Sequence, residues 1–264
     1  MSESVKNETI RFGMVPDWNV DSMVALLPEK DGRYDLYNID GYSRENFEDV
    51  GLLERYFSQK IRECMKHCEN IDSEFYVTRK TTDFSLIAVL NCLIWVSRSL
   101  TVYFWDREEE IYRGTEFLTG KADCHPATDC RFPADHHCAS GFCPESEAVP
   151  CVLLNRHNIG TCSELNTAVT DGNIIFSGDG LTGESIPDNW MFDFRFLSET
   201  ASASLQRIQA SAGQNGKHAV RFYLCGLKPL TVIAVNEARK LGFCVECMHW
   251  NMDRESYFPQ NVVF

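Results

Sequence analysis

Short runs of β-branched and aromatic residues, separated by polar or charged breaks, constrain the fold of this chain more than any other feature. They begin after Glu74 and are typical of β-strands. In the segment 190–197, aromatic residues at every second position alternate with mostly polar ones, which predicts a half-buried strand. The other segments predicted as strands are 75–78, 85–90, 93–96, 100–105, 151–154, 173–176, 219–225 and 243–250.

Two stretches carry helical signals instead. In 43–70, apolar residues recur at steps of three and four, which predicts one amphipathic helix with Ser43 as its N-cap. The segment 230–241 predicts a short late helix that Gly242 ends. The stripe along the first helix consists of Phe47, Val50, Leu53, Phe57, Ile61, Cys64 and Cys68.

Together these elements predict a mainly β fold, a β-sandwich with a projecting N-terminal helix and arm. We expect residues 1–72 to form the arm and the amphipathic helix, an assembly element. Residues 73–264 would form the sandwich body, with a cysteine-rich loop at 121–150. The pattern indicates no internal repeat.

Composition excludes several functional classes. The net charge of −13 offers no basic surface for nucleic acid, so we expect no direct nucleic-acid binding. No apolar run approaches the about 18 residues that cross a bilayer, so no membrane contact is expected. The N-terminus lacks the pattern of a secretory signal, which indicates the cytoplasm. In that reducing compartment, 12 cysteines are unexpectedly many.

Half of the cysteines fall between residues 124 and 162, in and just after a loop with little apolar content. They are disulfide or loop-staple candidates: Cys124, Cys130, Cys138, Cys143, Cys151 and Cys162. The alternative is a zinc site formed by the first four, although their spacing matches no common zinc motif. Cys244 and Cys247 have the spacing of a zinc pair but lie within a predicted strand, where they would point to opposite faces.

A thiol hydrolase is the enzymatic alternative. Cys162 follows Gly160-Thr161, and a cysteine nucleophile needs a base within hydrogen-bond reach, for which His157, His218 and His249 are the candidates. The glycine-rich stretch 177–183 lacks the lysine and the following helix of a phosphate-binding loop, so it predicts a turn.

Two segments resemble cypovirus polyhedrins, the proteins that crystallise in insect cells around virus particles. Ser185-Ile-Pro-Asp-Asn-Trp-Met191 resembles a segment ahead of a core strand in that family. The stretch from Leu230 to Pro259, with His249-Trp-Asn and Tyr257-Phe-Pro, follows a similar order of elements. The resemblance covers about the last hundred residues, and neither the cysteine-rich loop nor the acidity fits it.

The resemblance implies a non-enzymatic, self-assembling viral protein. Homotrimers would pack into a crystalline lattice around virus particles in occlusion bodies of the host cytoplasm. No catalytic residue and no cofactor would be required, although nucleotides occupy clefts in such lattices. Cysteines titrate near pH 8.5 and tyrosines near pH 10, so alkaline pH would charge and dissolve the lattice. The alternatives are a cytosolic cysteine-rich enzyme and a zinc-stabilised domain.

Overall fold

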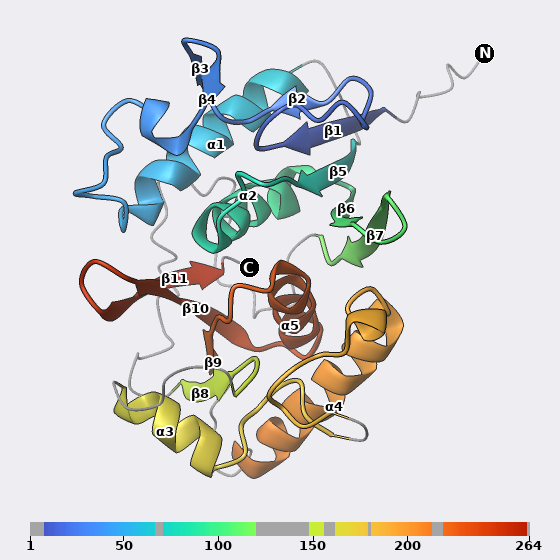
Figure 1. Cartoon of the computed structure of the whole chain (residues 1–264), viewed down its shortest axis with the longest axis vertical. Helices are drawn as coiled ribbons and strands as arrows, with labels where there is room; N and C mark the ends of the chain where they lie inside the picture. Colours follow the sequence, from blue (N-terminus) through green and yellow to red (C-terminus); the bar gives the residue numbers. More distant parts are fainter. Residues whose placement is uncertain are drawn as a thin grey trace, which may run out of the picture. The chain divides into compact units, whose positions relative to one another are not determined.

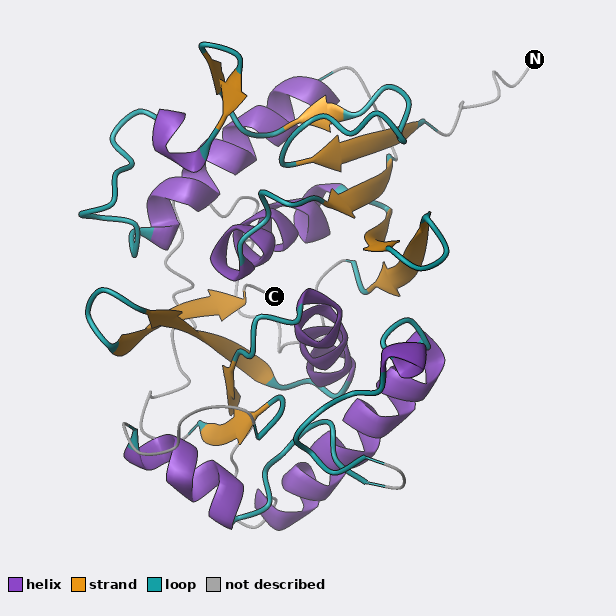
Figure 2. Ribbon diagram, viewed as in Figure 1, coloured by secondary structure: helices purple, strands orange, loops and turns teal. Residues whose placement is uncertain are grey.

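The chain forms two compact units. The computed structural model describes residues 8–66, 71–119, 148–155, 162–178, 181–212 and 219–262. The first unit holds the elements from β1 to β7 and the second those from β8 to β11. Figure 1 labels these elements, and Figure 2 distinguishes helices from strands.

The first unit is built on a five-stranded sheet in the order β2-β1-β5-β6-β7. All neighbouring strands are parallel except β6 and β7, which form a hairpin. The helices α1 and α2 pack against each other. The elements are β1 (Thr9–Gly13), β2 (Val24–Ala25), the small hairpin β3 (Glu29–Lys30) and β4 (Arg33–Tyr34), the 3-10 helix η1 (Leu36–Asn38), α1 (Val50–Met65), β5 (Asp72–Val77), α2 (Asp83–Val96), β6 (Ser99–Asp106) and β7 (Ile111–Phe117).

The second unit is built on a four-stranded sheet in the order β11-β10-β9-β8. Here β8, β9 and β10 are parallel, and β11 closes the sheet as an antiparallel hairpin strand. The helices α4 and α5 pack on each other, and α3 packs on β8. The elements are β8 (Val149–Val152), α3 (Ser163–Thr170), the 3-10 helix η4 (Asp188–Trp190), α4 (Phe194–Ala212), β9 (Ala219–Tyr223), α5 (Lys228–Lys240), β10 (Cys244–Asn251) and β11 (Ser256–Val262).

The predicted mainly β sandwich is therefore wrong, because each unit is a mixed α/β structure whose central strands are parallel. One reason is α2, which replaces two predicted strands at 85–90 and 93–96. Every residue from Ser85 to Ile94 is buried, so the helix has no polar face to reveal its period. Thr82 and Ser85 form a reciprocal capping box that starts the helix.

The second reason is α4, which occupies the second half of the predicted strand at 190–197. The Asp193 carboxylate accepts a hydrogen bond from the backbone N–H of Phe196 at 3.0 Å, which caps the new helix. Leu197, Ala201 and Leu205 are buried at helical spacing farther along. The aromatic alternation covers only the end of η4, the turn before α4 and the first residues of α4, so the strand that it predicted does not form.

A helix does lie within the predicted range 43–70, over Val50–Met65, and Asp49 rather than Ser43 caps it. Leu53, Phe57 and Ile61 are at most 1% exposed, so they contribute no apolar surface to an external partner. Phe47 precedes the helix and Cys68 lies outside the described residues. The expected boundary after residue 72 falls at the first residue of β5, inside the first unit.

The two units repeat one topology, which corrects the expectation of no internal repeat. In each, three parallel strands joined by helical connections are followed by an antiparallel strand. A parallel contact also flanks the first strand on its outer side: β2 beside β1, and Ile174 beside Val152 at the end of β8.

The last hairpin of each unit carries the clearest sequence correspondence. Trp105-Asp106 and Tyr112 in the first unit match Trp250-Asn251 and Tyr257 in the second at the same spacing. The Asp106 side chain accepts backbone N–H bonds from the residues two and three positions later, and Asn251 does the same. Glu110 and Glu255 then adopt positive φ, at 52° and 48°. Few other residues match between the two units, which is why the repeat is not visible in the sequence.

Candidate functional site

The burial pattern separates the two faces of the second unit's sheet. Along β10, Val245, Cys247, His249 and Asn251 are buried, while the alternate residues are more exposed. On the buried face, α5 packs against β10. On the opposite face, α3 packs on β8, and Leu165 and Ala168 of α3 join Val152 and Tyr223 in a small core. A cavity of about 420 Å³ lies on this second face.

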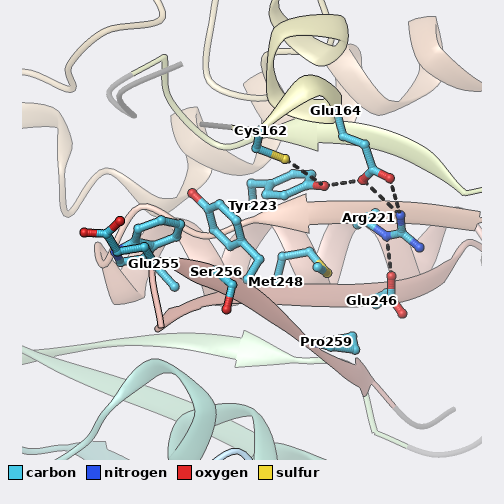
Figure 3. A pocket seen from close by; sticks show the side chains of 11 residues that line it. Cys162, Glu164, Arg221, Tyr223, Glu246, Met248, Glu255, Ser256 and Pro259 are labelled. Carbon is cyan, nitrogen blue, oxygen red and sulfur yellow. Dashed lines mark hydrogen bonds and ion pairs between the residues drawn. The ribbon is translucent and has the colours of Figure 1, made fainter. Parts of the chain in front are cut away.

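Side chains from α3, the three strands β9 to β11 and the β10–β11 turn line the cavity (Figure 3). β9 ends at Tyr223, β10 ends at Asn251, and Trp250 pairs with Tyr257 across the hairpin. The aromatic end of the cavity therefore lies at the carboxyl edge of the parallel strands. The lining residues are Cys162, Glu164, Arg221, Tyr223, Glu246, Met248, Trp250, Glu255, Ser256, Tyr257 and Pro259.

Arg221 organises the polar side of the cavity. Its Nη1 lies 3.1 and 3.0 Å from the two carboxylate oxygens of Glu164, and its Nε donates to Glu246. The side chains of Arg221 and Glu246 are only 13% and 12% exposed. Burial acts to lower the pKa of Arg221, but its bonds to Glu246 and Glu164 outweigh burial and raise it. The guanidinium is therefore a fixed cation that holds two carboxylates in place.

Glu164 also joins α3 to β9. The Tyr223 hydroxyl donates to its carboxylate, and this bond is the first cause that lowers the Glu164 pKa, followed by the bonds from Arg221. Burial, together with the bond to Glu164, raises the pKa of Tyr223. Figure 3 shows Glu164, Arg221 and Tyr223 converging from α3 and β9. Glu164 stays ionised and Tyr223 stays protonated across the physiological range.

Aromatic rings form the other side. Tyr257 packs edge-on against Tyr223 and Trp250, with ring centroids 4.9 Å apart in both pairs. Trp250 is 38% exposed, so part of its indole faces solvent. Burial raises the pKa of Tyr257 to about 12. The cavity thus combines aromatic surface with three carboxylates, Glu164, Glu246 and Glu255, and one paired guanidinium.

Of the two predicted thiol-hydrolase residues that the structure describes, Cys162 lines the cavity and His249 does not. Cys162 precedes α3 as its N-cap residue, and its sulfur lies 4.0 Å from the Tyr223 hydroxyl. His249 is 4% exposed and belongs to the buried set of β10 residues, on the face away from Met248 and Trp250. Burial lowers the His249 pKa to about 4. His157 and His218 lie outside the described residues.

The cysteine loop itself, with Cys124, Cys130, Cys138 and Cys143, also lies outside the described residues. Cys151 is a buried free thiol in β8, where burial raises its pKa, and Cys162 is also a free thiol. Among the described residues, no group of three His, Cys, Asp or Glu side chains is arranged to hold a metal ion. Cys244 and Cys247 lie in β10, with Cys247 buried and Cys244 partly exposed, as expected for opposite faces of a strand.

Sequence reasoning missed the residues that shape the cavity, above all Arg221, Glu164, Trp250 and Tyr257. Each belongs to a different element, and only the pairing of β9, β10 and β11 and the packing of α3 bring them together. The available signal was the recurrence of Trp-Asp/Asn and a following Tyr in the two hairpins.

A scan against protein-family models and a search of curated proteins give no match for this chain. Within the part of the chain that the structure describes, no helix has the length and apolar character to span a membrane.

Proposed function

We propose that the protein is a binding protein for a small nucleoside-containing ligand, and that the cavity of the second unit holds the nucleoside. The observation that carries this proposal is the position of the aromatic end of the cavity at the carboxyl edge of three parallel strands. In open α/β sheets, ligands bind outside the carboxyl ends of the strands. A cavity of about 420 Å³ is also within the range of small-molecule sites, about 300–1,000 Å³.

The aromatic side suits a planar base. Trp250 is partly exposed, and Tyr257 holds it at an interplanar angle of 62°. Any of the bases can stack on such a ring, because every base has a π-face. The base would therefore lie against Trp250 at the solvent-facing end.

The carboxylates suit the hydrogen-bond donors of a nucleoside. Ionised Glu side chains only accept hydrogen bonds, and ribose hydroxyls and exocyclic amino groups donate them. The cavity offers Glu164, Glu246 and Glu255 for this purpose. Arg221 is already paired with two of them, so phosphate groups would be repelled from the interior and remain at the mouth.

Binding rather than turnover is supported by the state of these polar groups. Glu164, Arg221 and Glu246 form one ion-paired network, and Tyr223 donates to Glu164. Such a network holds groups in a fixed geometry and leaves Glu164 with a lowered pKa, the opposite of what proton transfer near neutral pH needs.

The test is calorimetric titration of the purified chain with the four ribonucleosides and their 5′-monophosphates. We expect at least one nucleoside to bind, and its monophosphate to bind more weakly at low salt, because the interior carboxylates repel phosphate. Trp250→Ala removes a stacking contact worth about 1–3 kcal/mol, so it should weaken binding roughly 10- to 100-fold.

Trp18→Ala is the matched control, because Trp18 is 92% exposed and belongs to the first unit. The Trp18→Ala variant should bind the nucleoside with the same affinity as the unmodified protein. No binding of any nucleoside, or equal binding by the Trp250→Ala variant, would refute the proposal.

The crystal-forming function implied by the polyhedrin resemblance is not advanced as a second candidate. The β-sandwich that the resemblance implied is not the fold of this chain. Burial also raises the pKa of Tyr42, Tyr76 and Tyr112 above the ordinary value, so these groups would charge at a higher pH than the lattice-release hypothesis assumed. X-ray powder rings from expressing insect cells would revive that hypothesis.

A further inference from the structure

The repeated topology makes the strand residues of the cavity comparable with residues in β5, β6 and β7 of the first unit. Met248 in β10 lies beside Tyr223 on one neighbouring strand and Pro259 on the other. Tyr103 in β6 lies in the same register beside Tyr76 and Gly114. The two central side chains, Met248 and Tyr103, thus occupy equivalent places on equivalent sheets.

In the first unit, the chain's own ring covers this place. The Tyr103 ring stacks on Tyr76 with a centroid distance of 4.6 Å and an interplanar angle of 8°. It also lies over Gly114, where an added Cβ would come within 2.7 Å of the Tyr103 Cε1 atom. The ring can lie across the neighbouring strand because that strand has no side chain at this point.

In the second unit, both members of the pair differ. Met248 packs against the small core that includes Tyr223, as Tyr103 packs on Tyr76, but it is a narrow, flexible chain. Pro259 stands where the first unit has Gly114, so a ring at position 248 would meet the proline. Met248 and Pro259 both line the cavity.

We infer that the pair at positions 248 and 259 decides whether this sheet face accepts a ligand. Methionine beside proline leaves the cavity of the second unit open, whereas tyrosine beside glycine covers the matching place in the first unit with the chain's own ring. The identity of the ligand in this inference rests on the proposed function. The claim that the pair keeps the cavity open or fills it does not.

The test transplants the pair of the first unit into the second, as the double variant Met248→Tyr with Pro259→Gly. In a crystal structure without ligand, we expect the introduced ring to stack on Tyr223 at close to the 4.6 Å spacing of Tyr76 and Tyr103, and to occupy the cavity. Titration with the nucleoside that binds the unmodified protein should give no detectable binding.

Met252→Tyr is the matched control, because it adds the same ring in the β10–β11 turn, where Met252 is 81% exposed and does not line the cavity. This variant should keep the cavity and the affinity of the unmodified protein. The inference is overturned if the introduced ring turns to solvent and the cavity persists, or if it fills the cavity and the nucleoside still binds as tightly. If the unmodified protein binds no nucleoside, the proposed function fails, while the crystal structure still decides the role of the pair.

Discussion

Replacement of Arg221 by methionine tests the physical account of the site most directly. Methionine keeps much of the apolar stem and removes the guanidinium. Glu246, whose side chain is 12% exposed, then loses a partner in a nearly buried position, and breaking a buried ion pair in this way costs about 3–5 kcal/mol. Glu164 is 46% exposed, so its lost pairing adds about 1 kcal/mol or less.

Because Glu246 keeps some hydration, we expect the total loss near the lower end, about 3 kcal/mol in the free energy of unfolding. Urea unfolding followed by circular dichroism measures this loss, with each resolved transition fitted separately because the chain has two units.

Two further variants separate the ion pair from general damage. Arg221→Met combined with Glu246→Gln removes the unpaired charge and should recover much of the loss. Arg195→Ala is the surface control, because Arg195 and Glu199 are 89% and 68% exposed and form an i,i+4 pair worth at most about 0.5 kcal/mol. If Arg221→Met costs no more than Arg195→Ala, or if the double variant is less stable than the single one, the reasoning about this network is refuted.

Three other changes have defined outcomes. Gly114→Ala should lower the free energy of unfolding by about 2 kcal/mol, since the new Cβ would meet Tyr103 at 2.7 Å; an unchanged melting temperature would contradict the ring placement. His249 is held neutral with a pKa of about 4 while unfolding restores a pKa near 6.5, so only the unfolded state gains a proton between these values, and stability falls as pH drops from about 6.5 to about 4. Relative to His249→Gln, this loss should approach about 3 kcal/mol in unfolding experiments at pH 7.5 and pH 4; parallel curves would argue against the buried neutral state. Asp193→Ala should cost about 1 kcal/mol by removing the cap of α4, whereas Asp193→Asn should be close to neutral in the same assay.

Much of the secondary structure was readable from local pattern. The predicted strands near β5, β6, β9 and β10 and the helices near α1 and α5 are found. In α1, β6 and β10 one face is buried and the other more exposed, which gives a visible period. The helix α5 is buried from Leu230 to Arg239, and the signal that located its end was Gly242. The predictions failed at α2, which is buried on all sides, and at α4, where aromatic alternation preceded a capped helix. Because these two segments were predicted to be strands, the sequence predicted a β-sandwich where the structure is α/β.

The candidate site was largely invisible in the same way. Cys162 was singled out for its local context, and it does line the cavity, but its expected partner His249 lies on the other face of β10. Arg221 and Glu246 are ordinary charged residues within predicted strands, and nothing in either segment indicates that the other lies beside it.

The sequence by itself therefore determined the elements with a visible period or a clear end signal, the acidity of the chain and the chemistry available to it. Tertiary structure alone decided that the central strands run parallel in two repeated units, and that Arg221 meets Glu164 and Glu246 on the polar side of the cavity. The physical reason is that the hydrophobic period of the sequence indicates only which residues are buried. Strand pairing and helix packing determine which distant residues lie on the same face.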